Sequence, residues 1–498
     1  MQNAKCKNLL GFLAVLLWGF LAPAASGQTK IIAGPMIGHV SDTSARLWMQ
    51  LNTSEVVTVR VFDVVQNQGL GSVRVDVEGP APFIFDSPLS GLKPNHNYRI
   101  EVLFDNKEVD LPEPQPVLRT APPPGEATTF TVGFGSCMSP AALVAGEDAG
   151  AGGGGSGGGR MPIFKPLDLI KPRAFFFLGN NGYLPVDFKE WPQKKRQAMR
   201  MLTDFHHRVR AAPDLQRLLR GSAIYGIWDE HDFGSADAGG GMGADGTVEG
   251  FVFTKESRAA FIRYWPNPDY GTPETPGVFY NVTLGDVDFF VLDNRTFRTP
   301  PMRLAQGAST MPGGKGAETP AADPVVPSVM LGAGQLAWLK AALTQSNATF
   351  KIVACGCPLL PTYRPERTWA AYPEERSAFF TWLRGSKISG VVMITGGGGG
   401  ERFGSELSAL TPPEKAVTEY PLYDLTCAPL AVPAALPAKD DTLENPMREG
   451  PAVSGINTFG TLDFGGPKSK RHLTMRVRDA EGKTRLEKVI FADELKGE

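Results

Sequence analysis

In the stretch AIYGIWDEHDFG (residues 223–234), an apolar segment passes directly into a cluster of acidic and histidine side chains. The apolar half has the length and composition of a buried β-strand. Beyond Thr129 the same arrangement recurs in five other segments: FTVGF before GSC (130–137), AFFFL before GNNGY (174–183), VDFFVL before DNRTFR (287–298), FKIVAC before GCP (350–358), and GVVMIT before a run of five glycines (390–400).

Two helical segments lie between these strands. Residues 194–220 form one, divided at Pro213, and residues 332–346 form another with leucines at helical spacing. Continuous apolar strands that alternate with helices predict an α/β fold whose sheets are covered on both faces. Ligands of such sheets gather at the carboxyl ends of the strands. The polar residues at the six strand ends are therefore candidates for one shared site.

The first hundred residues have a different pattern. ARLWMQL (45–51) and VVTVRVFDV (56–64) read as short strands of β-branched and aromatic residues. Tyr98, in LKPNHNYRIEV (92–102), resembles the tyrosine of the corner strand in fibronectin type III or immunoglobulin-like sandwiches. The proline-rich segment 120–128 predicts a linker. We therefore expect a β-sandwich over residues 28–121 and a second domain over 129–491.

Residues 1–27 have the pattern of a secretory signal peptide. Lys5 and Lys7 precede an apolar run (9–22), and small residues follow it. The run is shorter than the roughly 20 residues of a transmembrane helix, although an uncleaved anchor is the alternative. The pattern predicts an exported protein, periplasmic or extracellular, without a transmembrane anchor after cleavage.

Composition excludes some classes of protein. The 498 residues carry a net charge of −2, which gives no electrostatic argument for a nucleic-acid partner. The four cysteines beyond residue 27 are too few for a disulfide scaffold of this size. Cys355 and Cys357 read best as small buried residues on one face of a strand. Three Gly-rich segments (146–160, 234–246, 307–324) read as loops, and none has the pattern of a phosphate-binding P-loop.

The ordered series of motifs resembles the PhoD-like alkaline phosphatases, a family of metallophosphoesterases. The resemblance spans roughly residues 31–490 and is carried by FGSC (134–137), FLGNNGY (177–183), IWDEHDFG (227–234), LDNRTFR (292–298), GQLAWLKAAL (334–343), FKIVACGCP (350–358) and SELS (405–408). It implies an α/β/β/α metallophosphatase sandwich after a fibronectin III or Ig-like β-sandwich. It also implies hydrolysis of phosphate mono- and diesters with iron and calcium, because cations screen the ester's charge and activate water.

The resemblance also assigns roles to individual residues of this chain. It implies catalytic groups at His231, Asp232 and Arg295. It places the positions of metal ligands at Cys137, Asn180, Asn181, Tyr183, Asp229 and Glu406.

Two of the ligand turns depart from the family pattern. Asn180 stands where the family has the bridging aspartate, and glycines 396–400 stand where it has Asp-x-His. Cations bound without enough anionic ligands are costly to desolvate. We therefore expect weak metal binding and weak or absent phosphatase activity. The alternatives are a non-catalytic exported protein that binds phosphate or a surface, and a scaffold whose β-sandwich makes the contacts.

Several site residues have a structural reading beside the functional one. For Cys137 a small buried residue is favoured over a metal ligand, and Asp229 and Asp232 read equally as caps of the following turn. Arg295 and Arg298 read either as anion ligands or as partners in a salt bridge. For the two histidines of the 194–220 helix, His206 and His207, a core or solvated role is favoured over catalysis. The glycine run reads as a phosphate cradle or as a loop that lost its ligands.

Overall fold

The computed structural model describes residues 29–139, 161–185, 188–234, 238–240, 251–299, 301, 328–397, 404–410, 419–432 and 444–497. The predicted signal peptide, the 146–160 loop and most of the glycine run lie outside these residues. Within them, no helix has both the length and the hydropathy needed to cross a membrane.

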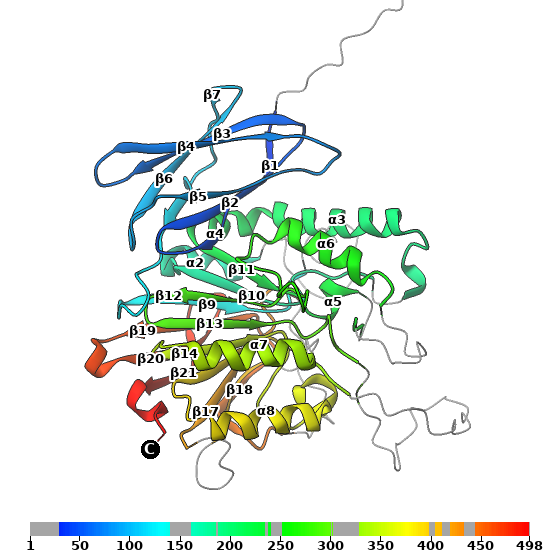
Figure 1. Cartoon of the computed structure of the whole chain (residues 1–498), viewed down its shortest axis with the longest axis vertical. Helices are drawn as coiled ribbons and strands as arrows, with labels where there is room; N and C mark the ends of the chain where they lie inside the picture. Colours follow the sequence, from blue (N-terminus) through cyan, green and yellow to red (C-terminus); the bar gives the residue numbers. More distant parts are fainter. Residues whose placement is uncertain are drawn as a thin grey trace, which may run out of the picture.

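The N-terminal part is a β-sandwich, as the alternating pattern predicts (Figure 1). One sheet has the order β1-β2-β5, from Ile31–Val40, Ser44–Leu51 and Phe83–Ser90. The other has the order β4-β3-β6-β7, with β8 beside β6, from Gln68–Val77, Glu55–Asp63, Asn97–Phe104, Lys107–Glu108 and Val117–Arg119. The buried Tyr98 hydroxyl accepts a hydrogen bond from the Lys93 amide at 2.6 Å, which is the contact of a tyrosine corner.

The first core sheet combines strands from both ends of the second part of the chain. Its order is β11-β10-β9-β19-β20-β21, from Ala223–Ile227, Ala174–Leu178, Phe130–Gly135, Thr458–Gly465, His472–Asp479 and Thr484–Phe491. Strands β9, β10 and β11 are parallel, and β19 is antiparallel to β9. The last strands of the chain therefore complete a sheet that its first core strands begin.

The second core sheet has the order β12-β13-β14-β15-β17-β16-β18, from Tyr280–Leu284, Val287–Leu292, Phe350–Cys355, Val391–Thr395, Leu422–Thr426, Ser405–Leu410 and Arg448–Val453. Strands β13, β14, β15 and β17 are parallel. The two sheets meet through aromatic side chains: the Phe176 ring of β10 stacks on Phe289 of β13 with centroids 4.7 Å apart.

Helices cover the outer faces of both sheets. They are α2 (Lys165–Ile170), α3 (Lys195–Ala211), α4 (Gln216–Gly221), α6 (Thr254–Tyr264), α7 (Gly332–Gln345) and α8 (Pro373–Gly385). The short helix α5 (Glu230–Phe233) follows the end of β11 instead. In Figure 1, α3 and α6 lie between the β-sandwich and the first core sheet, whereas α7 and α8 lie along the second. This arrangement confirms the predicted α/β/β/α fold, and the predicted break at Pro213 separates α3 from α4.

The β-sandwich is attached to the core by buried contacts. Trp48 of β2 is fully buried; its indole Nε1 donates to the Arg263 carbonyl at 2.9 Å, and its ring lies 5.7 Å from that of Tyr264. The backbone amide of Val40 donates to the hydroxyl of Tyr225 in β11 at 3.1 Å. The sandwich and helix α6 therefore share one buried interface.

Candidate functional site

The strand-end residues of β9, β10, β11 and β13 meet at one edge of the two sheets. Asn180 follows β10 and takes a positive φ of 50°; its side-chain oxygen accepts from the amide of His231 at 3.0 Å. A Cβ on Gly179 would lie 2.5 Å from the Cβ of Asp229, so these two turns approach as closely as glycine permits. The structure therefore brings the GNNGY and WDEHD motifs into direct contact.

Asp229 is the most strongly paired residue of this cluster. It is 1% exposed, and its Oδ1 accepts from Arg295 Nε at 2.7 Å and from Asn294 Nδ2 at 3.0 Å. Arg295 Nη2 lies 2.6 Å from the same oxygen and completes the ion pair. Burial opposes ionisation, but the Arg295 guanidinium outweighs it and lowers the pKa of the Asp229 carboxyl. The second oxygen, Oδ2, is buried and has no hydrogen-bond partner. Asp229 is thus an anion balanced by an internal cation.

Asp232, unlike Asp229, forms no ion pair with an arginine of the described residues; it joins the turn of Asn181 to the start of α5. Asp232 Oδ1 accepts from the Asn181 amide at 2.7 Å, and Oδ2 accepts from the Asp229 amide at 3.1 Å in the capping box of α5. Burial raises the pKa of Asp232 to about 8. Both oxygens of the Asp232 carboxyl therefore accept from backbone amides, which agrees with the interpretation of Asp232 as a cap of this turn.

Cys137 lies beside this cluster in a small apolar pocket. It has a φ of 62°, is fully buried and packs with Ala428, Val432 and Tyr183. Burial raises the pKa of the thiol to about 12, so it is protonated at neutral pH. The Tyr183 ring lies 4.4 Å from the ring of His231, whose Nε2 is 3.4 Å from Glu230 Oε1.

Glu406 belongs to a neighbouring cluster. It lies on β16, where its Oε1 accepts from Tyr363 at 2.6 Å and from Asn445 at 2.8 Å. Burial raises the pKa of its carboxyl. Glu406 and Arg367 line the same cavity of about 20 Å³, and the Arg367 guanidinium reaches Glu230 at 3.4 Å. The structure thus places Glu406 one side chain away from the residues around Asp229.

Three residues that contact this cluster are not among the site residues predicted from the sequence. Glu230 pairs with both Arg295 and Arg367 at 3.4 Å, and Asn294 orients Asp229. Glu230 and Asn294 each adjoin a predicted residue, and their motifs could have signalled them. Arg367 comes from the loop between β14 and α8, where the sequence carries no comparable motif.

The start of the glycine run has a packing role. A Cβ on Gly396 would lie 2.4 Å from the carbonyl oxygen of Leu178 and 2.5 Å from that of Gly356. The amide of Gly397 donates to Ser136 Oγ at 3.0 Å. Gly396 therefore allows β15 to end against the turns of β10 and β14, while residues 398–400 lie outside the described part.

The comparisons with known proteins agree with this architecture. A model of the PhoD-like phosphatases matches residues 150–399, half of the chain. The chain belongs to the PhoD-like phosphatase family. A solved structure of PhoD superimposes with a TM-score of 0.68 over 93% of this chain and 90% of that one, at 17% identity, a level at which the likeness shows the fold.

Other comparisons add little to the PhoD match. The sensor domain of the anti-sigma factor RsgI4 from Pseudobacteroides cellulosolvens (14% identity; 20% of this chain, 96% of that one) reaches a TM-score of only 0.16 and supports no argument. No curated protein matches the sequence.

The described donor set of this PhoD-like chain does not fit a dinuclear metal centre. Within the residues that the structure covers, no group of three or more His, Cys, Asp or Glu side chains is arranged to hold an ion. One oxygen of Asp229 is taken by Arg295 and Asn294, and the nearby Asn180 is neutral. A cation there would meet a guanidinium, and like charges in a desolvated site repel strongly.

Proposed function

We propose that this chain is a phosphoric ester hydrolase homologue whose activity is weak or absent. Membership of a phosphatase family supports phosphate esters as the ligand class. The observation that carries the proposal is the contact of Arg295 with Asp229 at 2.6 Å, with both side chains at most 2% exposed. The guanidinium already neutralises the buried negative charge of Asp229. A metal ion would therefore gain little electrostatic stabilisation from this carboxylate.

The charges around Arg295 favour binding of a phosphate anion without turnover as the second function. Three guanidiniums, those of Arg295, Arg298 and Arg367, face the two carboxylates of Asp229 and Glu230. Guanidinium groups match the geometry of phosphate oxygens. These guanidiniums can donate to the oxygens of an anion, yet without a metal ion the site has no activated water for hydrolysis.

Metal analysis and an activity assay on the same purified protein test the first function. We expect iron and calcium well below one ion per chain, and hydrolysis of p-nitrophenyl phosphate and bis(p-nitrophenyl) phosphate near the uncatalysed rate. Stoichiometric iron together with turnover would overturn the proposal. Titration with inorganic phosphate tests the second function, and Arg367→Gln should weaken any binding that is seen.

A repaired variant tests the correspondence with the family motifs. Asn180→Asp combined with Gly397→Asp and Gly399→His restores the missing anions and imidazole. We expect this variant to gain metal before it gains rate, because binding needs charge and catalysis also needs geometry. A repaired variant that folds and still binds no metal would contradict the alignment of these turns.

We also propose export, with removal of residues 1–27, on the signal-like pattern of the N-terminus. Expression of the full chain with N-terminal sequencing of the extracytoplasmic fraction tests this. A chain that keeps Met1 and stays inside the cell would contradict it.

A further inference from the structure

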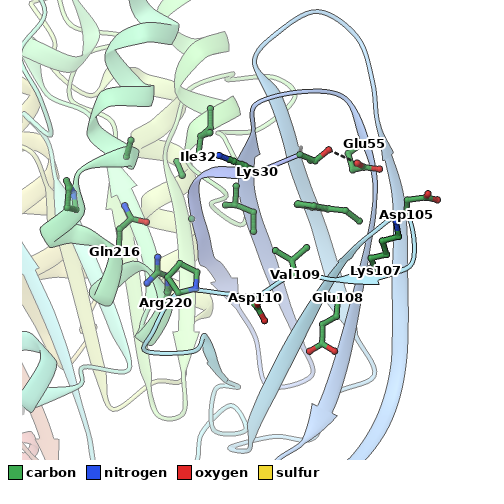
Figure 2. Close-up of a pocket in the computed structure, with 18 residues that line it drawn as sticks. Lys30, Ile32, Glu55, Asp105, Lys107, Glu108, Val109, Asp110, Gln216 and Arg220 are labelled. Carbon is green, nitrogen blue, oxygen red and sulfur yellow. Dashed lines mark hydrogen bonds between the residues drawn. The ribbon is translucent and has the colours of Figure 1, made fainter. Parts of the chain in front are cut away.

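A cavity of about 820 Å³ opens between the β-sandwich and the end of helix α3 and helix α4 (Figure 2). Its walls come from the start of β1, from the β6–β7 hairpin and the segment after it, and from residues 211–220. None of the residues of the candidate phosphatase site lines it. Its volume lies in the range of about 300–1,000 Å³ that is usual for small-molecule sites.

One side chain of this cavity is unusual. Arg220, in the last turn of α4, is only 6% exposed, and Figure 2 shows it on the α4 wall. Its Nε is buried without a hydrogen-bond partner, and its Nη1 reaches the Glu113 carbonyl only at 3.5 Å, the outer limit of a hydrogen bond. Among the described residues no carboxylate forms an ion pair with it. A buried cation without a counter-ion is costly.

The remaining lining is divided by polarity. Gln216 lies one turn before Arg220 on α4, and Lys30 enters from the start of β1 (Figure 2). Apolar surface comes from Ile32, Phe104 and Val109. The far rim is acidic on balance: on the hairpin side, the exposed carboxylates of Asp105, Glu108 and Asp110 outnumber the one exposed ammonium there, that of Lys107.

We propose that this cavity binds a small organic anion, with a single carboxylate or phosphate head on Arg220 and its apolar body against Ile32 and Val109. The anion supplies the counter-charge that the guanidinium lacks, in a geometry that both headgroups match. The acidic rim repels a second anionic group, so the outer end of the ligand is neutral or cationic. This site is independent of the proposed phosphatase function.

Calorimetric titration of the full chain with hexanoate, hexyl phosphate and hexylammonium tests the proposal. We expect at least one of the two anions to bind and hexylammonium not to bind. Arg220→Gln should weaken anion binding at least tenfold, whereas Arg217→Gln, on the exposed face of the same helix, should leave it unchanged. The preferred headgroup distinguishes a carboxylate ligand from a phosphate ligand. No binding of either anion, or full binding by Arg220→Gln, would overturn the proposal.

A stability measurement separates binding from a purely structural role of Arg220. Arg220→Met removes an uncompensated buried charge, so its midpoint of thermal unfolding without ligand should equal or exceed that of the unmodified chain. The rise in midpoint that the anion produces should disappear in this variant. A lower midpoint without ligand would show that Arg220 serves the fold, and would count against the site.

Discussion

At the scale of single residues, Arg295 organises the edge of the sheets where a metal centre is expected. Its guanidinium contacts Asp229 and Glu230, and its pKa is raised because these two anions outweigh the effect of burial. The turn that presents it is fixed by Asp293, which accepts from the indole of Trp228 at 2.7 Å. The salt bridge is thus an integral part of a buried network, which is the structural reading of Arg295.

Removal of Arg295 should therefore destabilise the protein. Arg295→Met leaves Asp229 buried without its cation and Glu230 with Arg367 alone, and we expect a loss of about 3–5 kcal/mol in the free energy of unfolding. Urea denaturation measures it. The double variant Arg295→Met/Asp229→Asn should recover part of the loss.

The exposed Arg60, which lies 4.0 Å from Glu101, offers the control. Arg60→Met should change the free energy of unfolding by less than about 1 kcal/mol. An Arg295→Met variant as stable as the unmodified chain would show that its charge is not needed to balance the two acids.

Gly226 allows a second test at this scale. A Cβ at this position of β11 would lie 2.1 Å from the Trp265 ring, while a Cβ on Gly221 meets nothing within 4 Å. Gly226→Ala should cost about 1–3 kcal/mol through overpacking. Gly221→Ala is the matched control and should be neutral in the same thermal or urea unfolding experiment.

At the scale of elements, helix α3 buries a neutral histidine. His206 stacks on Tyr264 with centroids 5.4 Å apart, and its Nε2 has no hydrogen-bond partner. Burial, with a smaller effect of Arg210, lowers the pKa of this imidazole to about 3 from an ordinary value of 6.5. The folded helix therefore excludes a proton that the unfolded chain accepts.

This exclusion predicts an acid dependence of stability. Below pH 6.5 the unfolded state binds a proton at His206 that the folded state does not, so the free energy of unfolding falls as pH falls towards 3. By pH 5 the loss relative to pH 7.5 should reach about 2 kcal/mol. His206→Phe should remove this part of the dependence in urea titrations at the two pH values, and an unchanged dependence would contradict the burial of a neutral ring.

Elements also show how far the sequence predicts the structure. Features that depend on a short stretch of sequence are predicted correctly. Tyr98 identifies the corner of the β-sandwich, and Pro213 marks the end of α3. Apolar runs followed by polar residues locate β9, β10 and β11. Contacts between residues far apart in the sequence are not predicted, because no local pattern specifies them. Arg367 pairs with Glu230 across 137 positions, and the residues around Cys137 come from β9, the β10 turn and the segment after β17.

At the scale of the whole molecule, the β-sandwich and the core should unfold together. Trp48 buries its ring against Tyr264 and its indole N–H on the Arg263 carbonyl. Trp48→Ala should cost about 3–5 kcal/mol and split one calorimetric transition into two. Val65→Ala, at a site 79% exposed in the same sandwich, should keep a single transition. Two transitions in the unmodified chain would contradict this coupling.

The pairing of β9 with β19 constrains how the chain reaches its fold. Phe130 lies opposite Phe464, and Phe134 opposite Gly460, so the central ladder of the first core sheet joins segments separated by more than 300 residues. During synthesis, the edge of β9 that pairs with β19 stays unpaired until nearly the whole chain has left the ribosome. Nascent chains of this protein should consequently assemble slowly and depend on chaperones that shield unpaired strands during synthesis.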